Sequence, residues 1–443
     1  MNVRWIHSIA LLMCGANLST AAAQAADSTT AREIGPGVTL RTIVRATGPV
    51  TMHVLEVDLR HPQLTVRAVR ACDRGTGRER PSAIARRLRA DGVDVVAVIN
   101  AGFFDLEGGT GTSESNVVVD GEIAKGVEIT ESPFDKVDNA HSQFGFTENR
   151  RPVIDRFRLT GTVRTPRGTW ALGAVNGTPV ANDVALYTRW SDRPPRYPAS
   201  MRSAAVPLEL VHRDTMSVGA RGAVSRYRVV AAVRDTTTDS TGMRALLVGA
   251  GTAAIGVAQL RVGDVVTVDA RFTPERGALR SVVGGWPRIV RGGVDVSGAA
   301  DSVEGTFPRF SNTRHPRSVV GFSRDSATLY LVAVDGRQAS SVGMSLGELA
   351  PAMIALGLHD ALNLDGGGST ALVVGDSVVS HPSDATGERP VGDVLVITRD
   401  SERSARRTAP AQRVAASCVV GGNRDPDRVA PATAPAVAPV RPQ

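Results

Sequence analysis

The sequence predicts an α+β protein, rich in strands that form mixed sheets, with few helices and one large domain. Many short segments alternate apolar and polar residues and are separated by turn residues, a spacing typical of strands. Only two segments show clear helical spacing. Strands and helices do not alternate steadily, so a parallel α/β fold is not expected.

The first part of the domain is expected to hold three strands, a helix and a buried, valine-rich strand. In chain order these are Val38–Val44, Thr51–Val57, Leu64–Val69, residues 81–88 and Asp94–Ile99. Pro81 lies in the first turn of the helix, where a missing backbone N–H costs nothing.

The segment from residue 115 to about 295 is predicted to form mainly β-strands, because turn residues recur at short intervals between short apolar segments. Its clearest strands are Val117–Val119, Trp170–Val175, Val184–Tyr187, Tyr227–Val233, Ala245–Val248, Val265–Val268 and Ile289–Val290. Asp235–Ser240 and Pro194–Met201 are expected to be loops.

The last part begins with a predicted hairpin and a second helix, and it ends on three strands. These elements are Val319–Phe322 with Thr328–Val334, then Ser345–Leu358, then Ala361–Leu364, Thr370–Val374 and Val394–Ile397.

The N-terminus has the features of a cleavable signal peptide, residues 1–25. Arg4 precedes the apolar stretch that starts at Ile9–Met13, and Ala23-Gln24-Ala25 offers a cleavage site. We expect a linker over 26–37, the domain over 38–400 and a disordered tail rich in Ala, Pro and Arg over 401–443. The protein is therefore predicted to be periplasmic or secreted, without stable membrane insertion. A lipoprotein anchored through Cys14 is the alternative.

Removal of the signal peptide would leave two cysteines, Cys72 and Cys418. An even number of cysteines in an oxidising compartment suggests a disulfide, and two unpaired thiols are the alternative. The spacing of the three cysteines does not suggest a zinc site.

The charge of the chain argues against a nucleic-acid partner. The net charge of +7 rests on 49 arginines and two lysines, which are dispersed rather than gathered in a stripe. With 10 Phe, 4 Trp and 4 Tyr, the chain also lacks an extended stacking surface for single strands.

The most informative segment is Asn363–Thr370, where a carboxylate and three glycines separate two strands. Asp365 is followed by Gly366, Gly367, Gly368 and Ser369. Glycines let backbone N–H groups converge on an anion, with Asp365 beside it. The alternative is a plain hairpin, because Asp-Gly between apolar strands is a strong turn signal.

Four further clusters contain candidate site residues, each with an ordinary structural alternative. Asn100 follows a buried strand and precedes Phe103, Phe104 and Asp105, which would otherwise pack around a turn. Two arginines before a strand could grip an anion or simply be solvated. A hairpin turn or an irregular loop would account for the other two clusters. These three clusters are Arg314–Arg317, Asp335–Gln338 with Arg337, and His381–Val391 with Glu388 and Arg389.

The ordered set of motifs resembles the phosphodiester glycosidase family. The motifs are NAGFFD, GGWPRIVRGG, RHPRSVVGF, VDGRQ, LGELAPAMIALGL, NLDGGGST and PSDATGERPV, and the resemblance spans roughly residues 38–400. NAGFFD differs from the commoner NGGFF through Ala101.

This resemblance implies a catalytic domain that hydrolyses the sugar C1–O bond of a sugar-1-phosphodiester. Arg317 and Arg389 would hold the phosphate with the amides of Gly366–Gly368, and Ser369 would line the same site. Asp365 would face the anomeric carbon as base or nucleophile. Asn100 would bind sugar or phosphate, and Phe103 or Phe104 would form an apolar wall. Secondary candidates are Asp335 and Arg337, which would orient these groups, and Glu388 as an acid.

Two other functions stay open on the sequence alone. The same loop could grip an anionic polysaccharide without turnover. Alternatively, Asp105, Asp335, Asp365 and Asp384 could collect a divalent ion in a metal-assisted phosphodiesterase. The glycosidase hypothesis requires no cofactor and no catalytic metal, and a structural Ca²⁺ remains an alternative.

Overall fold

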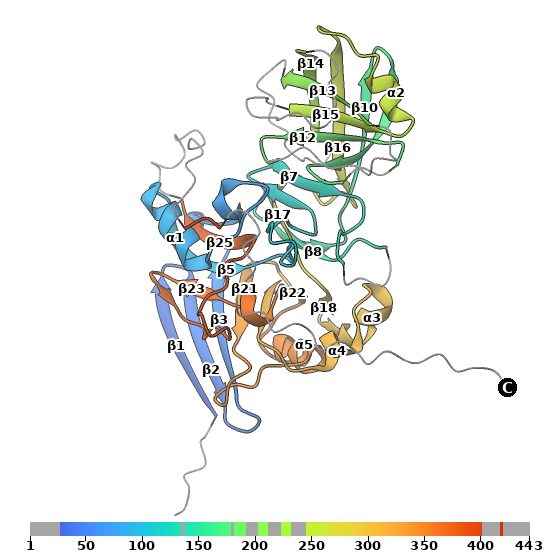
Figure 1. Cartoon of the computed structure of the whole chain (residues 1–443). Helices are drawn as coiled ribbons and strands as arrows, with labels where there is room; N and C mark the ends of the chain where they lie inside the picture. Colours follow the sequence, from blue (N-terminus) through green and yellow to red (C-terminus); the bar gives the residue numbers. More distant parts are fainter. Residues whose placement is uncertain are drawn as a thin grey trace, which may run out of the picture.

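The computed structural model describes residues 27–133, 138–178, 181–191, 203–210, 223–231, 245–400 and 417–419. Its strands form three sheets, of which two make a sandwich and the third extends into a separate barrel-like lobe (Figure 1). The predicted fold class, α+β with β-rich mixed sheets and few helices, is confirmed.

The sandwich consists of an eight-stranded and a five-stranded sheet, both antiparallel. In spatial order the larger sheet contains β1 (Ser28–Gly35), β2 (Val38–Arg45), β3 (Val50–Asp58), β21 (Thr328–Val334), β20 (Arg317–Phe322), β22 (Asp360–Asn363), β18 (Arg288–Arg291) and β19 (Val294–Asp295). The smaller contains β24 (Ser377–Val378), β23 (Leu372–Val374), β5 (Asp94–Asn100), β25 (Asp393–Arg399) and β4 (Leu64–Arg70).

Apolar side chains fill both the space between the two sheets and their outer faces. Leu55 and Leu331 of the larger sheet share a buried cluster with Ile99 and Leu395 of the smaller one. The other face of the larger sheet packs against α5 (Leu346–Ala355), and the other face of the smaller sheet packs against α1 (Pro81–Ala90). The layers therefore run helix, sheet, sheet, helix, which buries both faces of each sheet.

The third sheet has twelve strands, and part of it closes on itself. Pairing of its first strand with β11 joins seven strands into a ring around their own apolar core, which includes α2 (Ala253–Val257). Strands β11 and β12 run parallel, which makes the sheet mixed. In spatial order the strands are β10 (Arg158–Thr165), β16 (Val265–Thr273), β14 (Ala223–Val229), β13 (Ser203–Leu210), β15 (Ala245–Ala250), β12 (Val184–Thr188), β11 (Gly168–Val175), β7 (Glu122–Val127), β6 (Val117–Val119), β17 (Leu279–Gly284), β8 (Gln143–Thr147) and β9 (Pro152–Asp155).

Helix α5 begins with a recognisable capping motif, and the helices not yet named are short. The Ser345 hydroxyl accepts from the amide of Glu348, whose carboxylate accepts in turn from the Ser345 amide. This capping box satisfies two amides that a helix start leaves free. The short helices are η1 (Ala71–Asp73), η2 (Ser297–Ala299), α3 (Ala300–Val303), α4 (Pro308–Asn312) and η3 (Gly367–Ser369).

One expectation about the start of the chain is wrong. Residues 26–37 were expected to form a linker, yet Ser28–Gly35 is β1 and pairs with β2 along its length. This edge strand is largely exposed on both faces, so it lacks the alternation of apolar residues that signals a strand. Backbone hydrogen bonds to β2 hold it in place.

Several expectations fall on residues that are not described. The signal peptide with Cys14, most of the tail and the loops at Pro194–Met201 and Asp235–Ser240 lie outside the described ranges. Within these ranges no helix has the length and apolarity needed to span a membrane.

The expected disulfide between Cys72 and Cys418 is confirmed. It joins η1 to the short segment 417–419, which also pairs Val419 with Arg78 and bonds the Ser417 hydroxyl to Glu79. The two cysteines are 346 positions apart, so the bond closes nearly the whole domain into one loop.

Loss of this disulfide should destabilise the fold. We expect Cys72→Ser with Cys418→Ser to lower the free energy of unfolding by about 2–5 kcal/mol, because the bond restricts a very long loop in the unfolded chain. Denaturant unfolding of the oxidised protein and of this double variant measures the difference. Equal midpoints, or a native protein whose peptide map contains both free thiols, would contradict the prediction.

Candidate active site

Five loops that are far apart in the sequence meet at one end of the sandwich. Asn100 at the end of β5 lies opposite Val394 at the start of β25, and the end of β22 pairs beside the start of β20. Arg317, the first residue of β20, lies opposite the last residue of β21. Antiparallel pairing thus brings together the loops that carry the predicted site motifs.

The Asn100 side chain joins these loops. Its amide nitrogen donates to the carbonyl of Asp365 at 2.5 Å, and its oxygen accepts from the Ser318 hydroxyl at 2.7 Å and the Ala371 amide at 3.2 Å. The side chain is fully buried. Asn100 therefore positions Asp365, and the predicted contact with substrate is not available to it in this structure.

The glycine segment is not a hairpin. It leads from β22 in the larger sheet to β23 in the smaller one, through the short helix η3. The Asp365 amide donates to Ala101 at 2.9 Å, which ties the segment to the turn after β5. Asp365 is therefore fixed by its own backbone at the boundary between the two sheets.

The Asp365 carboxyl group is half-buried and has an altered acidity. Burial raises the pKa of Asp365 to about 6, against the opposing effects of the Ser369 hydroxyl, Arg389 and the Gly366 amide. Ser369 itself is buried, so it acts on Asp365 and does not face solvent. A carboxyl group with this pKa can exchange a proton near neutral pH.

The three glycines admit two guanidinium groups rather than forming the expected cradle of amides. The Gly366 amide donates to the Asp365 carboxylate and the Gly367 amide to Pro316, both at 2.9 Å. A Cβ at Gly367 would lie 2.9 Å from Nη2 of Arg337, and one at Gly368 would collide with Arg389. Absence of side chains at these two positions therefore brings both arginines against the loop.

Arg337 and Arg389 lie close enough to repel each other. Burial and the positive charge of Arg389 lower the pKa of Arg337. Arg389 is paired with Asp384 through bonds of 2.8 and 3.1 Å, whereas Arg337 contacts the ring of His315 at 3.4 Å. An anion between the two guanidinium groups would relieve this repulsion.

His315 is held neutral beside these arginines. Burial together with Arg317, Arg337 and Arg309 lowers the pKa of His315 to about 4. A neutral ring can accept a hydrogen bond from Arg337. Arg337 also has a φ of 60°, a strained conformation for a residue with a side chain and one common at functional sites.

Arg317 is not placed to hold a substrate phosphate. Its side chain is almost fully buried and donates to the carbonyls of Met344, Phe310 and Thr313 at 2.8 to 3.2 Å. The guanidinium lies 5.0 Å from the Phe310 ring centre. Burial lowers the pKa of Arg317 to about 10, with a further effect from Arg337. Arg317 lies at the start of a buried strand, which the residue type does not reveal, so the predicted role as a phosphate ligand is not supported.

Glu388 and Asp335 form hydrogen bonds that hold the site loops in place. The Glu388 carboxylate accepts from the Ser82 amide at 2.9 Å and so satisfies the first turn of α1. The predicted role of Glu388 as an acid is therefore not supported. Asp335 accepts from the His381 amide at 2.8 Å and lies 3.1 Å from His53, consistent with an orienting role.

The two phenylalanines of NAGFFD point to different places. Phe104 is buried in the cluster under α1. Phe103 joins an aromatic cluster, with ring centres 5.7 Å from Trp286 and 6.2 Å from Phe310. His141 stacks on Trp286 at 5.0 Å. Of the two, Phe103 is the one that can form an apolar wall beside the site.

The four aspartates considered as metal ligands have separate partners. Asp105 accepts from the Gly108 amide and the Thr110 hydroxyl in its own loop, and Asp384 pairs with Arg389. Among the described residues, no group of three or more His, Cys, Asp or Glu side chains is arranged to hold a metal ion.

Glu114 is a site residue that sequence reasoning missed. Its amide donates to Phe103 at 3.0 Å, so the turn after β5 holds both Glu114 and Asp365. Its side chain is buried, and this burial raises the pKa of Glu114 to about 7. Asp365 and Asp105 raise it further, whereas Ser132 and Lys125 lower it. The charge of Asp365 thus contributes to the raised pKa of Glu114.

Comparison with known proteins agrees with this geometry. Residues 221–398 match the model of the phosphodiester glycosidase family, so the resemblance carried by the motifs is confirmed over this part of the chain. The match contains the glycine loop, Arg317, Arg337 and Arg389.

Among particular proteins, the chain is 37% identical over 103 residues to N-acetylglucosamine-1-phosphodiester alpha-N-acetylglucosaminidase of Bos taurus. This alignment covers 22% of the chain and only 19% of the bovine protein. The chain is also 36% identical over 87 residues to the SPbeta prophage-derived uncharacterized protein YomE of Bacillus subtilis, covering 20% of the chain and 13% of that protein.

A solved structure shares the fold over most of the chain. A hypothetical protein from Synechocystis superposes with a TM-score of 0.64 at 22% identity, covering 84% of this chain and 64% of that one. The fold is therefore shared with this structure over a much longer part of the chain than the sequence comparisons align.

Arg317→Met should destabilise the protein rather than weaken substrate binding. The substitution leaves three buried carbonyls without a donor, so we expect the free energy of unfolding to fall by about 3 kcal/mol or more. Arg314→Ala, which removes an exposed ion pair with Glu348, should change the free energy of unfolding much less, because water screens the pair. A stable Arg317→Met variant with a raised KM would return Arg317 to the phosphate site.

Proposed function

We propose that the protein hydrolyses the sugar C1–O bond of a sugar-1-phosphodiester. The observation that carries this proposal is the half-buried Asp365 carboxyl group beside a glycine loop flanked by two arginines. The leaving group is a phosphate monoester with a second pKa of about 6, so it departs more easily than an alkoxide. The site then has to hold the phosphate and stabilise the positively charged sugar.

Arg337 and Arg389 are the proposed phosphate ligands. Both guanidinium groups lie against Gly367 and Gly368, and their mutual repulsion disappears when an anion binds between them. Arg389 also lowers the pKa of Asp365, which indicates that the phosphate would lie next to that carboxyl group. This arrangement supports cleavage at the sugar side of the phosphate.

Asp365 and Glu114 form the proposed pair of carboxyl groups. Glycoside hydrolysis commonly uses one ionised and one protonated carboxyl group. With pKa values of about 6 and 7, Asp365 loses its proton first and Glu114 keeps its own. We assign Asp365 to the anomeric carbon as base or nucleophile, and Glu114 to proton donation to the leaving oxygen.

We also propose that the protein acts outside the cytoplasm. The disulfide between Cys72 and Cys418 supports this, because such bonds persist in oxidising compartments. An exported hydrolase of this kind would meet sugar-1-phosphodiesters in extracellular or periplasmic glycans.

Product analysis tests the reaction, and Asp365→Asn tests the residue. Incubation with methyl N-acetylglucosamine-1-phosphodiester should release N-acetylglucosamine and methyl phosphate. We expect Asp365→Asn to lower kcat/KM by about 10²–10⁴-fold. Asp376→Asn, at a carboxylate whose side chain is 90% exposed, should keep full activity.

Each competing function predicts a different result. Sugar-1-phosphate and methanol as products, with loss of activity in a chelator, would indicate a metal-assisted phosphodiesterase. Saturable binding without any product would indicate a polysaccharide-binding protein. Folding of Asp365→Asn is checked by its melting temperature, which at pH 8 should equal or exceed that of the wild type. The raised pKa of Asp365 means that its ionised form costs stability above pH 6.

Glu114→Gln should change the pH dependence of the reaction. Activity that needs ionised Asp365 and protonated Glu114 rises as pH passes about 6 and falls as it passes about 7. The variant should lose about 10²-fold in kcat, and the fall at higher pH should disappear. Glu107→Gln changes an exposed carboxylate of the same loop, and this variant should keep both the rise and the fall of the pH–activity profile. A Glu114→Gln enzyme with an unchanged profile would remove Glu114 from the mechanism.

A further inference from the structure

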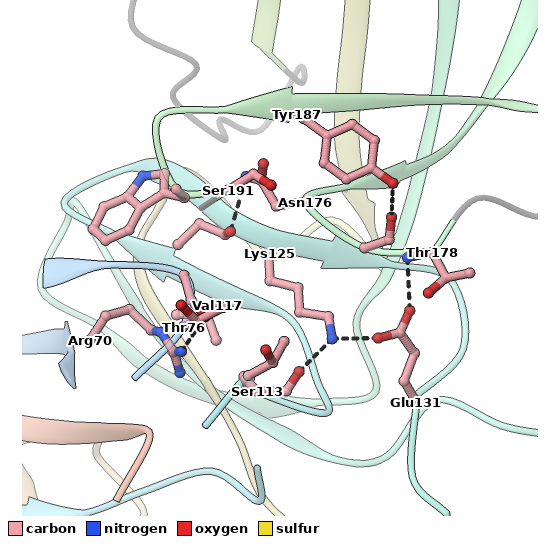
Figure 2. A pocket seen from close by; sticks show the side chains of 15 residues that line it. Arg70, Thr76, Ser113, Val117, Lys125, Glu131, Asn176, Thr178, Tyr187 and Ser191 are labelled. Atoms are coloured by element: carbon pink, nitrogen blue, oxygen red, sulfur yellow. Dashed lines mark hydrogen bonds and ion pairs between the residues drawn. The ribbon is translucent and has the colours of Figure 1, made fainter. Parts of the chain in front are cut away.

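A cavity lies between the sandwich and the barrel, away from the Gly366–Gly368 loop. Its volume is about 190 Å³, enough for roughly six waters at 30 Å³ each. Residues from both lobes line it, as Figure 2 shows for Arg70 and Ser113 on one side and Asn176, Thr178 and Tyr187 on the other. None of the groups assigned to hydrolysis lines this cavity.

The charged residues that line the cavity are paired. Nζ of Lys125 donates to Glu131 and to the Ser113 carbonyl, both at 2.5 Å (Figure 2). Arg70 lies 3.2 Å from Asp393 and donates to the Gly75 carbonyl at 2.6 Å. Each charge therefore has its counter-charge within the protein, which favours a ligand without net charge.

Two buried polar atoms in the lining have no hydrogen-bond partner among the described residues. They are the hydroxyl of Ser113 and the indole nitrogen of Trp190, on side chains that are 2% and 3% exposed. Buried polar atoms in folded proteins almost always have a partner, so two such atoms around one cavity require an explanation. A bound molecule with several hydroxyl groups would satisfy both.

The lining also combines aromatic rings with small polar side chains. Trp190 and Tyr187 contribute rings, and the Tyr187 hydroxyl is already bonded to Gly177 at 2.7 Å. Thr76, Thr112 and Ser191 add hydroxyl groups. Aromatic rings can contact the C–H groups of a ligand, and the polar side chains can bond to its hydroxyl groups. The lining therefore suits a molecule that has both C–H surface and hydroxyl groups.

We propose that this cavity binds one neutral pyranose ring. Its size admits a single sugar, its paired charges disfavour an ionic ligand, and its unpartnered donors match sugar hydroxyls. Ser113 directly precedes Glu114, so the cavity adjoins the catalytic turn. The sugar would be either a unit of the substrate beyond the phosphate or a free saccharide, and binding itself requires no hydrolysis.

Blocking the cavity tests the proposal. Titration calorimetry of the full chain with glucose, mannose and N-acetylglucosamine should give saturable binding of at least one sugar. Thr178→Trp places a large ring at the exposed edge of the cavity and should abolish this binding. Thr169→Trp, exposed on β11 outside the lining, should leave it unchanged. Asp365→Asn should also retain it, which separates this cavity from the hydrolytic site.

Ser113→Ala gives an independent test that does not depend on a bulky substitution. Its hydroxyl has no partner in the described part of the chain, so thermal stability should stay the same while sugar affinity falls about 5–10-fold. Thr398→Val removes another unpartnered buried hydroxyl, in β25, and should affect neither. Absence of saturable binding in the wild type would overturn the proposal. Unchanged affinity in both Thr178→Trp and Ser113→Ala would overturn it as well.

Kinetics then distinguish the two sources of the sugar. If Thr178→Trp raises KM for a diester whose second alcohol is a sugar, but not for the methyl diester, the cavity holds part of the substrate. If hydrolysis of both diesters is unchanged while free-sugar binding is lost, the cavity is a separate saccharide site. Either result supports the proposal; both rest on the proposed hydrolysis, whereas the calorimetric test does not.

Discussion

The site depends on one buried side chain, the amide of Asn100. Two antiparallel sheets end at the same edge of the sandwich, and only a few bonds determine how their loops align. Asn100 belongs to the smaller sheet, yet it bonds Ser318 of the larger sheet and the Asp365 carbonyl in the loop that connects them. Because all its hydrogen-bonding atoms are used within the protein, this amide sets the position of the reactive carboxyl group and does not itself react.

Around this fixed point, burial acts in opposite directions on acids and bases. The same loss of water raises the pKa of Asp365 and Glu114, and lowers that of Arg337 and His315. The carboxyl groups thereby become able to exchange protons near neutral pH, while the histidine stays uncharged. Two positive charges, those of Arg337 and Arg389, remain imperfectly compensated beside these groups, which is what the proposed anionic substrate would require. The chemistry of the site therefore follows from limited solvation as much as from the identity of its residues.

The sequence predicted many of the strands and both longer helices, because their apolar patterns face a core, but it did not predict others such as β8, β10, β13 and β17. It also placed Asp365, Arg337 and Arg389 in loops that meet in space. Arg317 and Glu388 were misjudged, since a motif shows that an arginine or a glutamate is present but not which carbonyl or amide it satisfies. Glu114 had no recognisable motif in the sequence, and only the fold buries it where the charge of Asp365 acts on it. The strand at Ser28–Gly35 was missed because it buries no apolar face.

The barrel is inserted into the chain in a particular way. Arg158, where it begins, lies opposite Thr273, where it ends, so the polypeptide enters the barrel and leaves it at neighbouring points. A module attached through two neighbouring connections can grow, shrink or be exchanged during evolution while its host keeps the same backbone. Relatives could thus acquire new binding preferences by altering one appendage, with the loops at the end of the sandwich inherited intact.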